Sequence, residues 1–346
     1  MPQIRLLIAD KDSMFLDKLS NYIYKNRGSN FLLELFTDPK KFEDWQRKNG
    51  KVDLIAVSSS FLYELSVKPD PINSIVLIDS PESLIPQEYN VINKYISAEK
   101  LIKEIISVIA DKLELNSYKD KNDLGTVYLV LYADGSDFYN PLAQSIACIK
   151  AINGSSTFYL NLDELSHTDS YFTGSNEKGL SEMLYYIKTK KSNLILKSET
   201  CTSKDINFGL DFMKGHKNPD DIRNMTPDEC ILLIETIKER SCYENIIVSR
   251  AFTPDKTLSV LIKLAGKIYI TSSNFYSSLE RLNRISESLP DINEKVYYCI
   301  NSICRMDKYY KIDNLRKVFL PDPYPGKCCF PPSNQYFTAV KSLLAQ

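Results

Sequence analysis

The loop from residue 132 to residue 141 is the segment of this sequence best placed to bind a phosphate group. It follows an apolar run at 126–132 that predicts a strand, and it precedes a helix-like segment at 141–151. A phosphate cradle needs glycines, because backbone amides must turn inward and approach the anion closely. This loop contains only Gly135, and Asp134 and Asp137 would repel a triphosphate. The loop therefore has the position of a phosphate site without its chemistry.

Other familiar site motifs are missing from the chain. The 346 residues include 11 glycines, none in a G-x-G, and 2 histidines, His167 and His216. A dinucleotide fingerprint and a multi-histidine metal site are thereby excluded, and no metal is predicted. Gly174 and Gly179 have the spacing that opens a phosphate loop, but Leu180 follows where a lysine is needed. We interpret that spacing as chance.

Composition bounds the class of protein and its partners. The formal net charge is −1, with 43% hydrophobic and 25% charged residues, which is typical of a globular protein and gives no reason to expect nucleic-acid binding. No apolar run approaches the roughly 18 residues of a transmembrane helix, and the N-terminus lacks the pattern of a secretory signal. We therefore expect a cytoplasmic protein without an integral membrane segment, whose eight cysteines are reduced.

Strand and helix signals alternate through the first 113 residues. Apolar runs predict strands at 4–9, 31–36, 53–57, 74–78 and 91–93. Helical spacing predicts helices at 13–26, 39–45 and 97–113, the last with Ser97 as its N-cap. This alternation predicts a parallel sheet with helices on both faces.

Residues 114–123 are polar and aperiodic, and we interpret them as a linker between two domains, 1–113 and 124–346. The alternation restarts after the linker. Strands are predicted at 126–132, 156–162, 193–197, 245–249, 267–271 and 295–300. Helices are predicted at 141–151, 180–189, 226–240, 257–265, 277–289 and 336–344, with Thr226 as an N-cap. The second domain is thus also α/β.

The first domain resembles a response-regulator receiver over residues 4–112, in the order and spacing of its elements. Receivers use acids after the first strand to hold Mg²⁺, an Asp after the third as phosphoacceptor, a Thr or Ser after the fourth and a Lys after the fifth. The matching residues here are Asp10, Asp12, Ser58, Asp79 and Lys94. A serine hydroxyl at the acceptor position has no evident activating base. The resemblance implies a flavodoxin-like (βα)5 pseudo-receiver in which Lys94 pairs with Asp10. Alternatively, Asp10 and Asp12 are ordinary loop acids.

The second domain resembles the MinD/ParA class of deviant P-loop ATPases, which has an α/β fold with a mostly parallel sheet. Members of that class follow their first strand with K-G-G-x-G-K-T-T. Here the strand leads into Tyr-Ala-Asp-Gly-Ser-Asp-Phe-Tyr-Asn, and the degenerate loop positions are Asp134, Gly135, Ser136, Tyr139 and Asn140. Asp134 stands at the signature lysine, Tyr139 at the Walker lysine and Asn140 at the Mg²⁺-binding hydroxyl. Most of the charge stabilisation that phosphoryl transfer requires is absent.

Four later residues correspond to other parts of that class. Asp163 ends a segment similar to V-D-x-D, and Ser249 stands at the Walker B aspartate. Asn301 and Pro321 match the residues that contact the adenine base, although Asn301 could equally end a strand and Pro321 shape a turn. The resemblance implies a pseudo-ATPase for which no cofactor is expected, with ATP binding kept as the alternative.

A receiver-like domain joined to a MinD/ParA-like domain resembles the layout of the CpaE/TadZ family, which is associated with Flp (Tad) pilus assembly and secretion. The resemblance covers nearly the whole chain. It implies a non-catalytic localisation or scaffold protein at the inner face of the membrane, held there by partners. The implied partners are the pilus secretion ATPase and other pilus-assembly proteins, and a homodimer is plausible.

Two other functions stay open at this point. One is a divergent ATPase that takes its lysine from elsewhere, such as Lys204, Lys214 or Lys217. The other is a regulatory module whose pseudo-receiver binds a protein. Titration with Mg-ATP separates the scaffold from the ATPase.

Overall fold

The chain forms two compact units, which we call unit 1 (residues 1–119 and 192–200) and unit 2 (residues 120–191 and 201–346). The computed structural model describes residues 4–27, 31–48, 52–79, 85–86, 88–112, 125–137, 139–191, 193–241, 243–289, 295–303, 316–326 and 329–345. The predicted linker, 114–123, lies outside the described residues. Residues 192–200 group with unit 1, whereas the sequence places them in the second domain.

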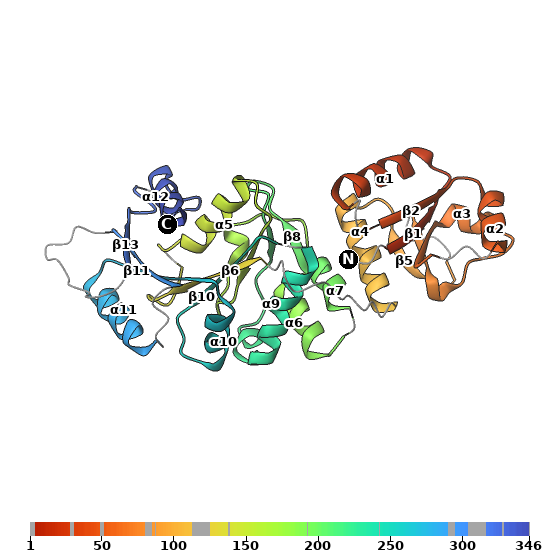
Figure 1. The fold of residues 1–346 in the computed structure, drawn as a ribbon. Helices are drawn as coiled ribbons and strands as arrows, with labels where there is room; N and C mark the ends of the chain where they lie inside the picture. Colours follow the sequence, from red (N-terminus) through yellow and green to blue (C-terminus); the bar gives the residue numbers. More distant parts are fainter. Residues whose placement is uncertain are drawn as a thin grey trace. The chain divides into compact units, whose positions relative to one another are not determined.

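Unit 1 is built on a parallel sheet of five strands in the order β2-β1-β3-β4-β5 (Figure 1). This order is common among doubly wound α/β sheets. The strands are β1 (Ile4–Ala9), β2 (Phe31–Phe36), β3 (Leu54–Ser58), β4 (Ser74–Ile78) and β5 (Asn90–Asn93). The helices are α1 (Ser13–Arg27), α2 (Pro39–Arg47), α3 (Ser59–Glu64), α4 (Ala98–Lys112) and, from the later segment, α7 (Leu194–Cys201).

Helices cover both faces of the unit 1 sheet, as the alternation of signals predicts. Successive residues of a strand point to opposite faces, so Leu6 packs in one buried cluster and Leu7 in another. The cluster around Leu6 contains residues of α1 and α4, and the cluster around Leu7 contains residues of α2 and α3. Leu196 of α7 belongs to the first of these clusters.

Unit 2 contains a sheet of eight described strands in the order β13-β12-β11-β6-β10-β7-β9-β8. Its strands are β6 (Thr126–Tyr132), β7 (Thr157–Asn161), β8 (Thr202–Lys204), β9 (Asp211–Met213), β10 (Asn245–Ala251), β11 (Lys267–Ser273), β12 (Val296–Asn301) and β13 (Lys317–Leu320). All neighbouring pairs are parallel except β8 and β9, which confirms the predicted α/β fold with a mostly parallel sheet.

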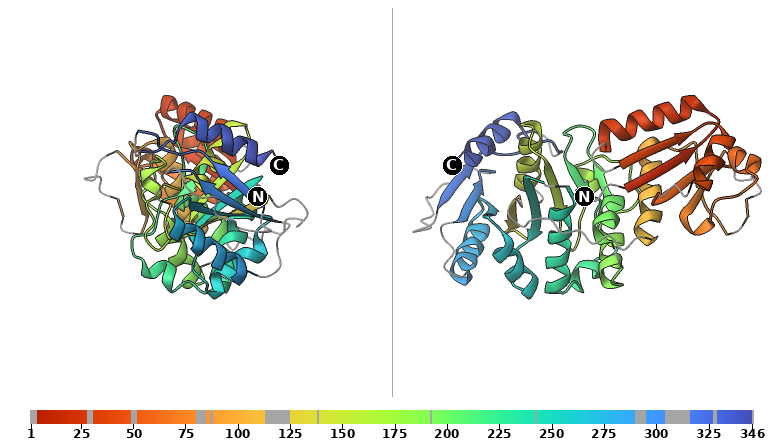
Figure 2. Two further views of the ribbon diagram at one scale, coloured as in Figure 1. Left: turned by 90° about the vertical axis from the view of Figure 1, so that its left-hand side faces the viewer. Right: turned by 45° about the vertical axis from the view of Figure 1, so that its right-hand side comes forward.

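The helices of unit 2 form a layer on each side of its sheet. They are α5 (Leu142–Ile152), α6 (Leu180–Lys188), α8 (Asp220–Arg223), α9 (Pro227–Ser241), α10 (Lys256–Leu264), α11 (Tyr276–Ser288) and α12 (Asn334–Leu344). Figures 1 and 2 show α5 and α12 on one face and α6, α9, α10 and α11 on the other. Tyr128, Val130 and Tyr132 of β6 pack in the cluster that includes α5 and α12.

Local sequence signals decide several element ends. Ser97 Oγ accepts a hydrogen bond from the amide of Lys100 (3.3 Å), and Thr226 Oγ1 accepts one from the amide of Glu229 (3.2 Å), so both predicted N-caps are confirmed. The predicted strand at 193–197 is wrong, because this segment lies in helix α7. Its apolar core, Leu-Ile-Leu, is too short for periodicity to separate a strand from a buried helix. The short elements α3, α8, β8, β9 and β13 are not predicted at all.

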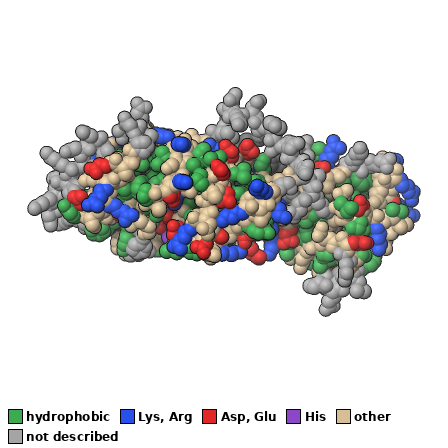
Figure 3. Space-filling view, turned by 90° about the horizontal axis from the view of Figure 1, so that it is seen from below, with side chains coloured by type: hydrophobic (Ala, Val, Ile, Leu, Met, Phe, Trp, Pro, Cys, Tyr) green, Lys and Arg blue, Asp and Glu red, His purple; other side chains and the backbone are tan. Residues whose placement is uncertain are grey.

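The surface charge and the lengths of the helices can also be compared with what the sequence predicts. Acidic and basic side chains are interspersed on the face seen in Figure 3, without a large area of one sign. Within the described residues, none of the helices has the length and apolar character that crossing a membrane requires.

Candidate functional site

The C-terminal ends of β6, β10, β11 and β12 meet at one edge of the unit 2 sheet, where α/β sheets commonly bind ligands. Asp134, in the loop after β6, lies at this edge, and its Oδ2 accepts hydrogen bonds from the backbone N and the Oγ of Ser273, each at 2.7 Å. The Nδ2 of Asn140 is 3.4 Å from the same oxygen. The carboxylate therefore fastens the loop to the end of β11.

Asn140 and Asn301 form the centre of a buried hydrogen-bond network at this edge. The Nδ2 of Asn301 donates to Oδ1 of Asn140, which also accepts from Thr271 Oγ1 at 3.0 Å. The Oδ1 of Asn301 accepts from the Tyr336 hydroxyl at 3.2 Å. Asn301 is fully buried. Its amide, the candidate base-binding group, is thus engaged on both sides by protein atoms.

A second buried network lies beside the first and includes the candidate Walker B position. The Nε2 of Gln144 donates to Asp137 Oδ2 at 2.8 Å and to the Tyr159 hydroxyl at 3.1 Å. That hydroxyl is 2.9 Å from Oγ of Ser249. Asp137, Gln144 and Ser249 are all buried. Ser249 is therefore a structural partner of Tyr159.

His167 closes this second network from the solvent side. Its Nε2 is 3.0 Å from Asp137 Oδ1 and 2.8 Å from the Tyr171 hydroxyl. The contact with Asp137 raises the pKa of His167 to about 9, although partial burial acts in the opposite direction. The imidazole is therefore a cation at neutral pH, and it offsets the charge of the buried Asp137.

Asp163 lies in the loop after β7, close to these groups. It accepts a hydrogen bond from the amide of Ala251, and its own amide donates to Asn161 Oδ1 at 2.8 Å. Burial raises the pKa of Asp163 to about 6; the Ala251 amide lowers it, and the charge of Asp137 raises it further. Asp134 and Asp163 thus both accept hydrogen bonds from donors of the protein itself.

The backbone of the 133–141 loop is also engaged internally. The amide of Gly135 donates to the carbonyl of Tyr132 (3.3 Å), and the amide of Asn140 donates to the carbonyl of Asp137 (2.9 Å). Tyr139 has a φ of 56°, in the left-handed region that non-glycine residues seldom adopt. Two of the amides that a phosphate cradle would use are therefore directed into the loop itself.

The corresponding edge of the unit 1 sheet is dominated by one ion pair. The Nζ of Lys94 is 2.7 Å from Oδ2 of Asp10, and both side chains are buried. Asp79 and Asp12 lie 3.8 and 4.0 Å from the same Nζ, and the ring centroid of Phe15 is 4.6 Å away. Burial acts to lower the pKa of Lys94, but the hydrogen bond and charge of Asp10 outweigh it, so the pKa is raised.

Ser58, at the phosphoacceptor position, has a different local role. Its hydroxyl accepts a hydrogen bond from the amide of Phe61 at 3.3 Å, so it is the N-cap of α3. The contact to Ser60 Oγ is 3.3 Å. A capping hydroxyl is already used by the backbone, which gives Ser58 a reason to be serine apart from any phosphoryl chemistry.

The structure brings seven of the fourteen sequence-predicted site residues together in two groups. Asp10, Asp12, Asp79 and Lys94 meet in unit 1, and Asp134, Asn140 and Asn301 meet in unit 2. Gly135 and Ser136 lie exposed in the loop, and half-buried Pro321 follows β13.

Sequence reasoning missed the residues that complete the networks. These are Gln144, Tyr159, Thr271, Ser273, Tyr336 and the cation His167. Thr271 and Ser273 carry a weak signal, because they are polar residues at the end of a predicted buried strand. Within the described residues no group of three or more His, Cys, Asp or Glu side chains has the arrangement to hold a metal ion.

Comparison with known proteins finds similarity to solved structures. No protein-family model matches the chain, and no curated protein matches it. Among solved structures, the chain is similar to a ParA family ATPase from Chlorobium tepidum, at 14% identity over 65% of this chain and 99% of that one, with a TM-score of 0.49. The MinD cell division protein of Aquifex aeolicus gives 17% identity over 64% and 98%, with a TM-score of 0.48. The cell division ATPase MinD of Pyrococcus furiosus gives 11% over 64% and 99%, with a TM-score of 0.46. Likenesses of this size carry no conclusion about activity.

Proposed function

We propose that this chain is a non-catalytic scaffold or localisation protein, in which both potential phosphate sites are closed by the protein's own side chains. The observation that carries the proposal is the network of Asn140, Thr271, Asn301 and Tyr336 across the edge of the unit 2 sheet. A nucleotide at this edge would have to displace buried hydrogen bonds. Each polar group left without a partner by such a change costs about 1–3 kcal/mol.

Electrostatics act in the same direction. Asp134 and Asp137 place two carboxylates beside the loop where a triphosphate would need cations. His167, a cation at neutral pH, is engaged with Asp137. Lys204, Lys214 and Lys217 were the alternative sources of a catalytic lysine, and Lys217 is paired with Glu182. The divergent-ATPase alternative gains no support from these contacts.

The pathway is proposed from the arrangement of a receiver-like unit and a MinD/ParA-like unit in one chain. On that basis we place the protein in Flp (Tad) pilus assembly, as a relative of the CpaE/TadZ proteins. It would act in the cytoplasm at the inner face of the membrane, bind the pilus secretion ATPase or another assembly protein, and form a homodimer. Unit 1 is then a pseudo-receiver, because Lys94 neutralises the acids that would hold a cation and Ser58 caps a helix.

The decisive experiment is calorimetric titration of the intact chain with Mg-ATP, combined with a phosphate-release assay. We expect no saturable heat up to millimolar nucleotide and no phosphate release above buffer. Asn301→Ala is the matched variant, because it opens the network without changing charge, and it should also stay inactive while Asp134 and Asp137 remain. Micromolar binding with turnover by the unmodified chain would overturn the proposal.

The pathway is tested separately by a two-hybrid assay between this chain and the Flp secretion ATPase encoded in the same genome. An interaction with that ATPase is the expected result. A genome that encodes this chain but no Flp secretion ATPase removes the pilus assignment and leaves the non-catalytic role untouched.

A further inference from the structure

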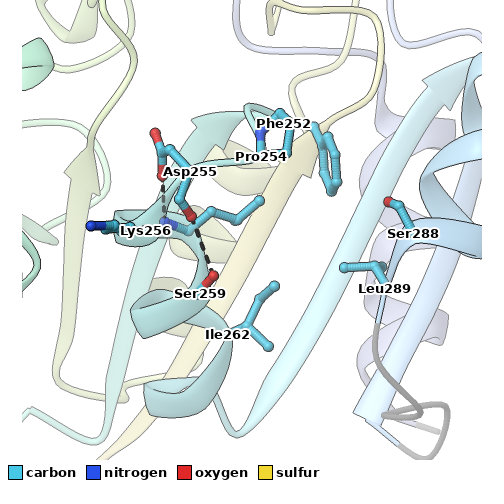
Figure 4. Close-up of a pocket in the computed structure, with 9 residues that line it drawn as sticks. Phe252, Pro254, Asp255, Lys256, Ser259, Ile262, Ser288 and Leu289 are labelled. Carbon is cyan, nitrogen blue, oxygen red and sulfur yellow. Dashed lines mark hydrogen bonds between the residues drawn. The ribbon is translucent and has the colours of Figure 1, made fainter.

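Two hollows meet at the first turn of α10 in unit 2. The first has a volume of about 410 Å³. Figure 4 shows Ser259 and Ile262 of α10 on one side of it and Ser288 and Leu289 from the end of α11 on the other, with Phe252 at one end. Five of its nine lining residues are apolar.

The second hollow, of about 430 Å³, is polar and carries a positive balance of charge. Three cations, Arg223, Arg250 and Lys256, and two carboxylates, Glu164 and Asp255, line it. The excess is a single positive charge, in a chain whose formal net charge is −1. The two hollows share Asp255 and Lys256, so the cationic and apolar halves form one surface.

Internal pairs hold most of these charges in place. Arg250 donates through both terminal nitrogens to the carboxylate of Asp255, which also caps α10 by accepting from the amide of Leu258 at 2.7 Å. Arg223 Nε donates to Glu164 Oε2 at 2.8 Å. Lys256 is exposed, and its ammonium has no ion-pair partner among the residues that the structure describes. It is the cation left for a ligand.

The weakness of a single exposed ion pair limits which ligand suits this surface. One exposed ammonium attracts an anion too weakly to hold a free phosphate by itself, because water screens the charge. Burying one large apolar side chain contributes more to binding than such an ion pair does. Binding here must therefore come mainly from an apolar group of the ligand. A carboxylate of the same ligand, paired with Lys256, would fix the position of that group. A peptide segment that carries both groups meets this requirement.

We propose that this double hollow docks an acidic peptide segment of a protein partner, with a carboxylate at Lys256 and an aliphatic or aromatic side chain between Ile262 and Leu289. The proposal deepens the scaffold function and rests on it, since it locates a surface that a partner would use. The charge complementarity at Lys256 and the adjoining apolar residues support this occupant, and a second copy of the chain or a nucleotide is an alternative outcome of the test.

The test is selection of a random twelve-residue peptide display library on the intact chain, followed by polarisation measurements with labelled synthetic peptides. We expect enrichment of sequences in which Asp or Glu flanks a large apolar residue. Lys256→Glu should weaken the selected peptide about tenfold or more, since it replaces attraction by repulsion. Lys263→Glu makes the same charge change at an exposed position of α10 outside both hollows and should leave binding unchanged.

A filling variant tests the apolar half. Ser259→Trp places a large ring in the first hollow and should abolish binding. Ser342→Trp is its control, because Ser342 is also an exposed helical serine whose Oγ bonds a carbonyl four residues earlier. Peptides without acids, or binding unaffected by Lys256→Glu and Ser259→Trp, overturn the proposal. So does a dimer in sedimentation that Ser259→Trp dissolves, or Mg-ATP binding that Lys256→Glu removes. The Mg-ATP titration above tests catalysis independently, so a failed peptide selection does not affect that conclusion.

Discussion

The C-terminal edges of the two parallel sheets are closed in different ways. In unit 1 a buried ammonium, Lys94, lies among three carboxylates and pairs directly with Asp10. In unit 2 neutral amides and hydroxyls close the edge, with Asn301 and Asn140 at the centre. An ion pair depends on one partner, because a buried charge without compensation is costly. A network of neutral groups spreads the cost over several weaker bonds. The first edge should therefore be the more sensitive to a single substitution.

The largest effect is expected for Lys94→Met, which leaves Asp10 buried without its cation. Breaking a buried ion pair in this way costs about 3–5 kcal/mol of unfolding free energy. Denaturation followed by the fluorescence of Trp45, the single tryptophan, reports on unit 1. Lys11→Met, which removes an exposed pair with Glu64, should cost less than about 1 kcal/mol. Equal losses for the two variants would show that Lys94 does not dominate this edge.

A second substitution sharpens the same point. Combining Lys94→Met with Asp10→Asn removes both charges, so the double variant should be more stable than Lys94→Met alone. If the double variant is the less stable of the two, the stability lost in Lys94→Met comes from packing around Phe15 and not from the uncompensated charge of Asp10.

The unit 2 network is probed by Asn301→Ala. This change removes one of the two donors to Asn140 Oδ1 and leaves the Tyr336 hydroxyl without its acceptor, so we expect a loss of about 1–3 kcal/mol in unfolding free energy. Circular dichroism during denaturation measures it. Asn218→Ala, at an exposed loop position, should cost under about 1 kcal/mol. If Asn301→Ala loses more unfolding free energy than Lys94→Met, the unit 1 edge is not the more sensitive of the two.

The pH dependence of unit 2 should reflect Asp163. Its pKa is raised from 3.8 to about 6 in the folded chain, so the folded state binds this proton more tightly than the unfolded state. Stability from this group is then fully present below pH 3.8 and is lost as pH rises through about 6, by roughly 2–3 kcal/mol. Asp163→Asn should remove this component from urea denaturation measured at pH 4, 5 and 7. An unchanged profile contradicts the raised pKa.

The smallest effect is expected at His167, which is partly exposed. Its pKa rises from 6.5 to about 9 through its contact with Asp137, so its contribution is complete below pH 6.5 and is lost as pH rises through 9. The unmodified chain should therefore have a higher unfolding free energy than His167→Gln at pH 6, and the two values should become equal near pH 10. Asp137→Asn serves as the control, because without the carboxylate the difference at pH 6 should vanish.

Much of the fold is predictable from the sequence. The strands 4–9, 31–36, 74–78 and 126–132 are predicted to the residue, because each is a short apolar run bounded by polar residues or turn signals. The helix caps Ser97 and Thr226 are local chemistry as well. Segment 193–197 was predicted as a strand and is a helix, since Leu196 packs in the unit 1 core, a contact that no local pattern specifies.

The candidate sites divide in the same manner. That the 133–141 loop has one glycine and no lysine can be read directly from the residue types. The partners of those residues cannot, because Asn140 bonds Asn301 from 161 positions away and Asp134 bonds Ser273 from 139 positions away. The order of strands in the sheet decides such contacts, and that order cannot be read from the spacing of residues in the sequence.

By itself, the sequence determined that this chain is built of alternating strands and helices and that the loop after β6 has one glycine and no lysine. Both follow from properties of single residues: apolar periodicity, capping side chains, backbone freedom and charge. Only the tertiary structure decided what occupies those places instead. The parallel registers of β11 with β6 and β12 bring Thr271 and Asn301 to one edge, and the sheet order in unit 1 brings Lys94 to Asp10. Once buried together, polar groups must satisfy one another, and at each of these two sheet edges the side chains do so with partners from other strands and loops.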